Sequence, residues 1–242
     1  SLQREWSMTE HSLSIIIPTW QAETSLARLL AWCQNSLPQA PVIVTDANSN
    51  DKTPDIANSY KTILINSDRG RGTQLAHGVK QTNTTWLLIL HADSQPSDSF
   101  AEAIGHHMAT YPGCAGYGRL AFDTDQWRGR LVAWGANKRA AWFGLPYGDQ
   151  GLLIPRRLYD AVGGYPTWPL MEDVELPRRL RQHYGKTVLR PLRSDILTDA
   201  VRYQQSGYTL RVLRNLGCLI RYYRGEDPTL IAKRYQSRAK PS

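Results

Sequence analysis

Short apolar runs alternate with segments of helical periodicity through the first hundred residues of the chain. Each run is bounded by polar or turn-forming residues, and a continuous apolar run is typical of a strand that is covered on both faces. The repeated order of strand and helix predicts an α/β fold with a mostly parallel sheet flanked by helices. The predicted strands cover residues 13–18, 41–46, 62–66 and 86–90, and the helices between them cover 22–35, 53–60 and 73–81.

The alternation of strands and helices becomes less regular after residue 112. The sequence predicts strands over 116–122 and 151–155 and a helix over 174–182. Pro177 is expected in the first turn of that helix, where a proline is tolerated because its missing N–H has no helical partner.

A basic amphipathic helix is predicted near the end of the chain, over residues 208–223. We therefore expect a domain over residues 8–200 and a basic helical extension over 201–242. The apolar face of this helix either packs on the rest of the protein or lies in the headgroup region of an anionic membrane. The face consists of Val212, Leu213, Leu216, Leu219 and Ile220, and the basic residues beside it are Arg211, Arg214 and Arg221.

Acidic residues follow two of the predicted parallel strands. Asp46 ends the second strand, and Asp93 follows the fourth, which is one of the most apolar runs in the chain. Ligands of open α/β sheets bind beyond the carboxyl ends of the strands, so both residues are candidates for a binding site. Two neighbouring carboxylates need a cation or a proton to coexist, and Mg²⁺ or Mn²⁺ is commonly held by such acids together with substrate phosphates. Asp93 could instead cap a helix that begins near Ser97, or close a turn.

A glycine-rich loop, "DRGRGTQ" at residues 68–74, precedes the third predicted helix. Glycines allow a ligand to approach the backbone, the start of a helix offers free N–H groups, and arginines bind phosphate. Arg69 and Arg71 are therefore candidates for binding a diphosphate. The alternative is an ordinary turn whose two arginines are solvated.

Bulk composition narrows the range of functions. The chain has 242 residues, a formal net charge of +8 and three cysteines without a C-x-x-C pair, which argues against a disulfide framework. No apolar run has the length that spans a bilayer, and we expect a cytoplasmic protein, peripheral to the inner face of the membrane if the basic helix contacts lipid. The charge fits a phosphate-bearing substrate or an anionic membrane, whereas no nucleic-acid-binding module is recognisable.

The chain contains, in this order, the segments "SIIIPTWQAE", "VTDANSNDKT", "RGRGTQLAHG", "LLILHADSQP" and "GGYPTWPLMEDVELPRRLR". The order and spacing of these five motifs resemble those of family 2 glycosyltransferases with the GT-A fold, a Rossmann-like α/β fold. The resemblance covers about residues 13–198, and the wording of "YGDQG" and "PLMEDVEL" is most similar to the radical-SAM/selenodomain-associated branch, also called arsenosugar-biosynthesis-like. It implies transfer of a sugar from a nucleotide diphosphate to an acceptor hydroxyl, with a UDP-sugar as the first candidate donor.

The resemblance also implies roles for residues on the nucleotide side. Pro18 and Thr19 match the segment along the base and ribose, with Glu23 nearby, and Asp46 matches the acid that binds the base edge. Asp93 matches the last acid of the Asp-x-Asp motif, which holds Mn²⁺ or Mg²⁺ against the diphosphate.

On the acceptor side, Asp173 and Glu172 match the acid pair from which inverting members draw their catalytic base. We expect Asp173 to be the base and Glu172 to orient it. The alternative is a pair of acids that stabilise a helix start. Trp168, beside the acid pair, and Asp149 are candidates for contacting the acceptor.

Two departures from the family pattern leave other functions open. Ala47 replaces the usual second acid after the second strand, and His91 replaces the first acid of Asp-x-Asp. A nucleotide-sugar-binding protein without catalysis is therefore one alternative. A sugar-phosphate nucleotidyltransferase is another, because its glycine-rich loop is similar to "GRGTQ", although that loop follows the first strand and the loop here follows the third.

Overall fold

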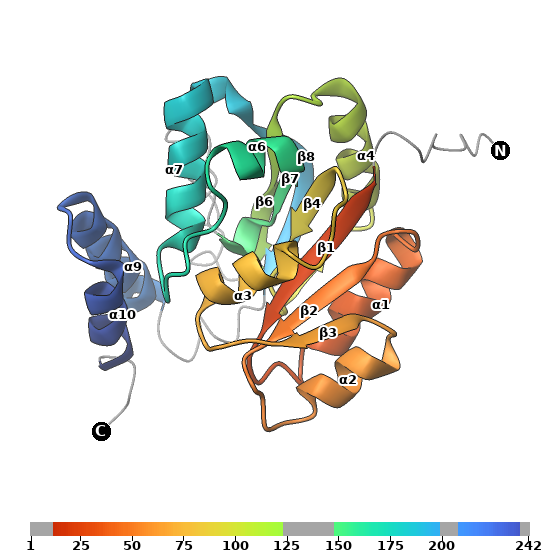
Figure 1. Ribbon diagram of the computed structural model, residues 1–242, viewed down its shortest axis with the longest axis horizontal. Coiled ribbons are helices and arrows are strands. Elements are labelled where there is room, and N and C mark those ends of the chain that lie inside the picture. The colour runs from red at the N-terminus through yellow and green to blue at the C-terminus, as the bar shows by residue number, and fades with distance from the viewer. Residues whose placement is uncertain (1–11, 123–147, 199–207, 238–242) are drawn as a thin grey trace.

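The structure is a computed structural model of the chain, and it describes residues 12–122, 148–198 and 208–237 (Figure 1). Within these ranges the strands form one eight-stranded sheet in the order β3-β2-β1-β4-β7-β6-β8-β5. The first half of the sheet is parallel, since β1 pairs with β2 and β4, and β2 pairs with β3. These strands are β1 (Leu13–Thr19), β2 (Val42–Asp46), β3 (Ile63–Asn66) and β4 (Trp86–Ile89).

The second half of the sheet has mixed directions. β7 lies between β4 and β6 and is antiparallel to both, whereas β6 is parallel to β8. The short β5 pairs antiparallel with β8 at the edge of the sheet. These strands are β5 (Ser94–Pro96), β6 (Ala115–Phe122), β7 (Leu152–Pro155) and β8 (Leu189–Thr198).

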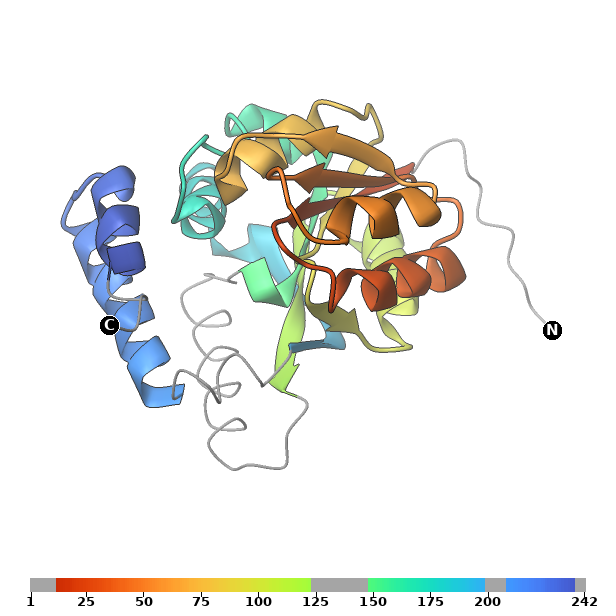
Figure 2. The same ribbon diagram turned by 90° about the horizontal axis from the view of Figure 1, so that it is seen from below.

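Helices cover both faces of the sheet, as the apolar character of the strands predicts (Figure 2). Successive residues of β1 point to opposite faces, so Ile15 and Ile17 join one buried cluster and Ile16 joins the other. One face is covered by α1 (Leu26–Ser36), α2 (Thr53–Ser59) and α4 (Phe100–Thr110). The other is covered by α3 (Arg71–Val79), α6 (Arg156–Ala161) and α7 (Glu172–Tyr184).

The predicted α/β fold with a mostly parallel, helix-flanked sheet is confirmed, with one shift that matters for the site. α7 begins at Glu172, so the acid pair occupies its first turn. Pro177 therefore lies in the second turn and not the first, contrary to the prediction. A proline there cannot donate the helical hydrogen bond to the carbonyl oxygen of Asp173.

α3 packs unusually close to its neighbours because small residues face them. A Cβ atom at Gly78 would lie 2.6 Å from Cγ2 of Ile16 on β1. The buried amide of Gln74 donates hydrogen bonds of 2.8 Å to the carbonyl oxygens of Thr19 and Thr45, at the ends of β1 and β2. The start of α3 is thereby fixed at the carboxyl edge of the parallel strands.

The C-terminal hairpin consists of α9 (Tyr208–Tyr223) and α10 (Pro228–Ser237), and it lies beside α7 (Figure 1). Cys218, Leu219 and Tyr222 of α9 pack against Met171 and Val174 at the start of α7. The predicted boundary between residues 200 and 201 falls in 199–207, outside the described residues. Across the described ranges, no helix combines the length and the apolar character needed to cross a membrane.

Gly72 provides a test of the close packing of α3. Its N–H donates to the carbonyl oxygen of Trp168 at 3.1 Å, and an added Cβ would lie 2.7 Å from that oxygen and closer still to the carbonyl oxygen of Pro166. Because both obstacles are backbone atoms, Gly72→Ala should lower the free energy of unfolding by about 1–3 kcal/mol. Gly217→Ala in α9, where an added Cβ meets nothing within 4 Å, is the matched control and should be neutral or slightly stabilising. Equal chemical denaturation midpoints for the two variants would contradict the packing argument.

Candidate functional site

The carboxyl ends of β1 and β2 carry a closed hydrogen-bond network around Asp46. The Asp46 carboxylate is fully buried and accepts from the Thr19 hydroxyl at 2.8 Å. It also accepts from the backbone N–H of Ser49 at 2.6 Å and the Ser49 hydroxyl at 2.7 Å. A carboxylate has about four acceptor positions, so this network occupies most of them. The predicted contact of Asp46 with a base edge stays a prediction.

An exposed aromatic residue, Trp20, borders this network. Its side chain follows β1 directly, is 44% exposed, and is covered by the guanidinium of Arg69 at 3.5 Å from the ring centroid. A guanidinium on an indole face is a favourable cation–π contact. Trp20 was not among the predicted site residues, although an aromatic residue just after a buried strand is a usable signal for a stacking surface. Arg69 therefore contacts Trp20 at the end of β1, whereas Arg71 has different partners.

Asp93 lies in a short connection between β4 and β5. The N–H of Ser94 donates to the carbonyl oxygen of His91 at 3.0 Å, and the Ser94 hydroxyl accepts from the N–H of His91 at 3.1 Å. α4 begins only at Phe100, after β5, so Asp93 does not cap that helix. The predicted turn at Asp93 is present, and it places His91 and Asp93 at the carboxyl edge of the sheet.

A partly buried ion pair joins the start of α3 to the start of α7. Arg71 Nε lies 2.8 Å from Oε1 of Glu172, and Arg71 Nη2 lies 3.8 Å from Oδ2 of Asp173. The Glu172 side chain is fully buried, whereas those of Asp173 and Arg71 are 16% and 37% exposed. The structure thus brings together one arginine of the glycine-rich loop and both acids of the predicted catalytic pair.

The charges in this cluster perturb one another strongly. Burial raises the pKa of Glu172 to about 7, the nearby Arg71 cation opposes this shift, and the charge of Asp173 adds to it. Burial acts to lower the pKa of Arg71, but the carboxylates of Glu172, Asp173 and Asp149 outweigh it and raise that pKa. Asp149, in the single turn Gly148–Gln150, therefore lies within electrostatic reach of the same arginine.

The residue before the acid pair has an unfavourable backbone conformation. Met171 is buried and has a φ of 73°, in the left-handed region that side chains other than glycine rarely adopt. Strain of this kind persists where surrounding packing enforces it and is concentrated at functional sites. Here the packing of α9 on Met171 and Val174 holds the first turn of α7 in place.

The remaining predicted site residues lie at different distances from this cluster. Pro18 is an interior residue of β1, and Glu23 is exposed, where its carboxylate accepts from the N–H of Lys52 at 3.1 Å. The ring centroid of Trp168 lies 6.5 Å from that of Tyr222 on α9, and its carbonyl oxygen accepts from the N–H of Gly72, next to Arg71. The two acceptor candidates, Trp168 and Asp149, both border the Arg71 cluster, whereas Glu23, a candidate for the nucleotide side, belongs to the loop after β1.

The described residues fit a cation that shares its ligands with a substrate. His91 and Asp93 offer an imidazole nitrogen and carboxylate oxygens, a donor set that suits Mn²⁺ and, more weakly, Mg²⁺. Among the described residues, no group of three or more His, Cys, Asp or Glu side chains could hold a metal by itself. Divalent cations at phosphate-transfer sites commonly take one or two protein ligands and complete their shell from the substrate and water.

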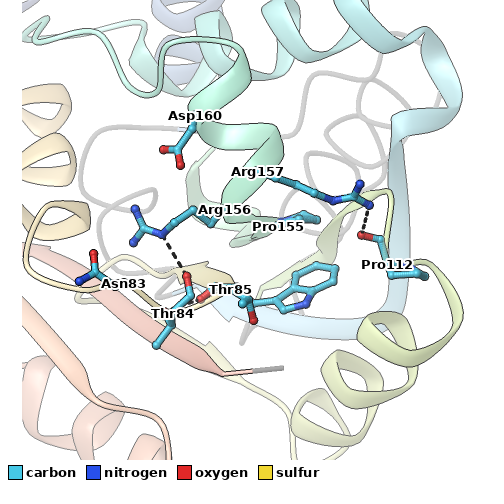
Figure 3. Close-up of a pocket in the computed structure, with 9 residues that line it drawn as sticks. Asn83, Thr84, Thr85, Pro112, Pro155, Arg156, Arg157 and Asp160 are labelled. Atoms are coloured by element: carbon cyan, nitrogen blue, oxygen red, sulfur yellow. Dashed lines mark hydrogen bonds between the residues drawn. The ribbon is translucent and has the colours of Figure 1, made fainter. Parts of the chain in front are cut away.

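A separate pocket of about 500 Å³ lies at the other end of the strands (Figure 3). It is lined by Thr85 and Trp86 at the start of β4 and by Pro155 at the end of β7. Its arginines are engaged by the backbone, since Arg156 donates to the carbonyl oxygens of Thr84, Val79 and Thr82 and Arg157 donates to that of Pro112. This pocket is therefore distinct from the edge that carries the acids.

Comparisons with known proteins identify a family for the sequence and similar folds among solved structures. The family described as glycosyl transferase family 2 matches residues 14–165. A search of curated proteins found no match. The fold is similar to crystal structures of glucosyl-3-phosphoglycerate synthase from Mycobacterium tuberculosis. Its complex with Mg²⁺ and UDP aligns with a TM-score of 0.61 and 13% identity over 79% of this chain and 71% of that chain.

Two further solved structures are similar to the same degree. The Mn²⁺ and UDP-glucose complex of that synthase has a TM-score of 0.61 and 14% identity over 79% of this chain and 71% of that chain. A mycobacterial protein has a TM-score of 0.60 and 14% identity over 78% of this chain and 65% of that chain. At this identity the similarity establishes the fold, which is the predicted GT-A fold. Since the family match covers more than half of the sequence, the chain is a glycosyltransferase that belongs to family 2.

Proposed function

We propose that the protein transfers a sugar from a UDP-sugar to an acceptor hydroxyl with inversion at the anomeric carbon, in a reaction that depends on Mn²⁺ or Mg²⁺. The observation that carries the proposal is the acid pair Glu172–Asp173 beside Arg71 at the edge where the parallel strands end. The similar synthase was crystallised with UDP-glucose and Mn²⁺, which supports this choice of donor and cation. The "YGDQG" and "PLMEDVEL" segments support a place in the radical-SAM-associated branch.

Asp173 is the proposed general base. Its carboxylate is partly exposed and sits in the first turn of α7, so an acceptor hydroxyl can reach it. Asp173 takes the hydroxyl proton as the acceptor oxygen forms its bond to the anomeric carbon and the bond from that carbon to the diphosphate breaks. Attack from the face opposite the leaving group inverts the configuration.

The donor side is assigned to the carboxyl ends of β1, β2 and β4. Pro18, Thr19 and Glu23 border the nucleoside, Asp46 organises the β1 and β2 ends, and Trp20 offers a ring for stacking. Arg69 and Arg71 supply positive charge for the diphosphate.

His91 and Asp93 would hold the cation, which when bound neutralises charge on the departing diphosphate. The acceptor side is assigned to Trp168 and Asp149, which both lie near Arg71.

Chain order argues against a sugar-phosphate nucleotidyltransferase, because the glycine-rich loop follows β3 and precedes α3. Binding of a nucleotide sugar without catalysis does not require a buried acid pair preceded by a residue in a strained conformation, as Met171 is here. Glycosyl transfer uses each of these features.

The hairpin of α9 and α10 is also proposed to contact an anionic membrane surface. One side of α9 packs on α7, as the core-packing alternative predicts, yet Leu216, Ile220 and Tyr223 remain 48%, 44% and 55% exposed. The exposed basic residues Arg224 and Lys233 belong to the same hairpin. An exposed apolar stripe with nearby cations suits the headgroup region of an anionic bilayer.

Asp173→Asn should lower turnover by about a hundredfold or more while leaving nucleotide affinity almost unchanged, because it removes the proton acceptor and keeps the shape. Release of UDP from UDP-glucose, followed with a panel of acceptors, gives the rate, and calorimetry gives the affinity. Asp160→Asn is the matched control, because Asp160 is an exposed residue of α6 that lines the remote pocket. Its turnover and nucleotide affinity should equal those of the unmodified protein. Loss of nucleotide binding with an unchanged maximal rate would place Asp173 in donor binding.

Asp93→Asn should abolish the gain in nucleotide affinity that Mn²⁺ provides to the unmodified protein, because an amide oxygen is a much weaker ligand for a hard cation. Calorimetric titration of UDP with and without Mn²⁺ measures both affinities. The idea fails if Mn²⁺ has no effect on UDP affinity in either protein.

The unmodified protein should co-sediment with phosphatidylglycerol vesicles, less so at high salt, because screening weakens the contribution of the basic residues. The double variant Leu216→Ser and Ile220→Ser should bind such vesicles less. Ile63→Ser, which changes an equally exposed isoleucine on β3, should bind them normally. If none of these proteins sediments with anionic vesicles, the membrane contact is excluded. If the unmodified protein self-associates and the double variant does not, the exposed apolar stripe binds a second copy of the chain instead.

A further inference from the structure

Glu172 is a buried acid whose charge depends on one neighbour. Among the described residues, neither carboxylate oxygen accepts a hydrogen bond of normal geometry. Its compensation is the ion pair with Arg71, at 2.8 Å. A buried carboxylate without hydrogen bonds is costly unless it is paired or protonated.

Besides Arg71 and a backbone N–H of its own helix turn, the described groups that face Glu172 do not favour its charged form. Asp173 follows it in α7 and adds negative charge, and Asp149 reaches the same arginine from the turn at Gly148–Gln150. The ring of Tyr165, in the loop that precedes α7, is buried close to both acids, and burial raises its pKa well above the usual value, so it carries no charge. Within the described ranges, Arg71 is therefore the cation that favours the charged form of Glu172.

Arg71 also belongs to the donor side of the proposed site. It is the first residue of α3, it follows Gly70 in the glycine-rich loop, and its side chain is 37% exposed. A diphosphate at this helix start would accept hydrogen bonds from the guanidinium more strongly than a single carboxylate does. One arginine thus lies between two competing anions, the donor diphosphate and the acid pair.

We propose that binding of the donor diphosphate draws Arg71 away from Glu172, so that Glu172 takes up a proton from solvent and Asp173 remains the charged member of the acid pair. This rests on the proposed function, keeps Arg71 as a donor-binding residue and makes Glu172 a positioning residue. Two adjacent carboxylates without a cation share one proton, and burial places it on Glu172. Without the donor, Arg71 Nη2 lies 3.8 Å from Oδ2 of Asp173 and competes with an acceptor hydroxyl for that carboxylate. Donor binding therefore prepares the base for the acceptor.

Calorimetry can count the protons that accompany donor binding. UDP-glucose is the probe, with saturating Mn²⁺, in buffers of different ionisation enthalpy at the same pH. UDP-glucose has no group that titrates near neutrality, and the charges of Mn²⁺ and of the diphosphate cancel. At pH 7.5 the unmodified protein should take up about half a proton or more per bound donor, because Glu172 begins with a pKa of about 7 and ends higher. At pH 5.5, where Glu172 already carries its proton, uptake should approach zero.

Variants assign the proton to Glu172. Glu172→Gln should still bind UDP-glucose but take up no proton, and Arg71→Met should also show none, because Glu172 is then protonated beforehand. Arg69→Met removes the neighbouring arginine of the loop, which stacks on Trp20, and should keep the uptake even where it binds more weakly.

The outcomes separate this inference from the proposed function. Tight binding with no proton uptake at pH 7.5, or uptake that persists in Glu172→Gln, overturns the coupling and leaves glycosyl transfer intact. Failure of UDP-glucose to bind in Mn²⁺ counts against the proposed donor and against the coupling together.

Discussion

The close approach of α3 to its surroundings is the constraint on which the rest of the site depends. Gly78 allows the helix to lie against Ile16, and the amide of Gln74 ties it to the ends of β1 and β2. Gly72 allows the loop before α7 to lie against the helix start. One rigid element thereby holds the strand ends, the glycine-rich loop and the acid pair at fixed separations. Without this packing, nothing would hold the Arg71 and Glu172 side chains within ion-pair distance.

Much of the fold could be predicted from the sequence, because the parallel half of the sheet has simple patterns. The run Trp86–Leu90 is apolar at every position, and the structure buries all of it. The start of α7 was harder to predict, since Met171 precedes it in a left-handed conformation and no side chain caps the helix. The acids of the first turn are a start signal, but without a capping residue before them the predicted start at residue 174 is two residues too late.

The residues of the site were easier to propose than their relations. Strand-end position and family resemblance pointed to Asp46, Asp93 and the acid pair, but neither could reveal that Thr19 and Ser49 already satisfy Asp46. The Arg71–Glu172 contact joins residues that are far apart in the chain, and it follows from tertiary packing alone. Trp20 was overlooked because single exposed aromatic residues are common on protein surfaces.

The position of β7 has a consequence for how the protein is made on the ribosome. β4 is the outer strand of the parallel half until β7 pairs with it, and the two are separated in sequence by everything between Ile89 and Leu152. At about 5–20 residues per second, that delay lasts several seconds. During this time an apolar strand edge is open to pairing with other nascent chains. Conditions that slow translation between these strands should therefore favour aggregation over native folding.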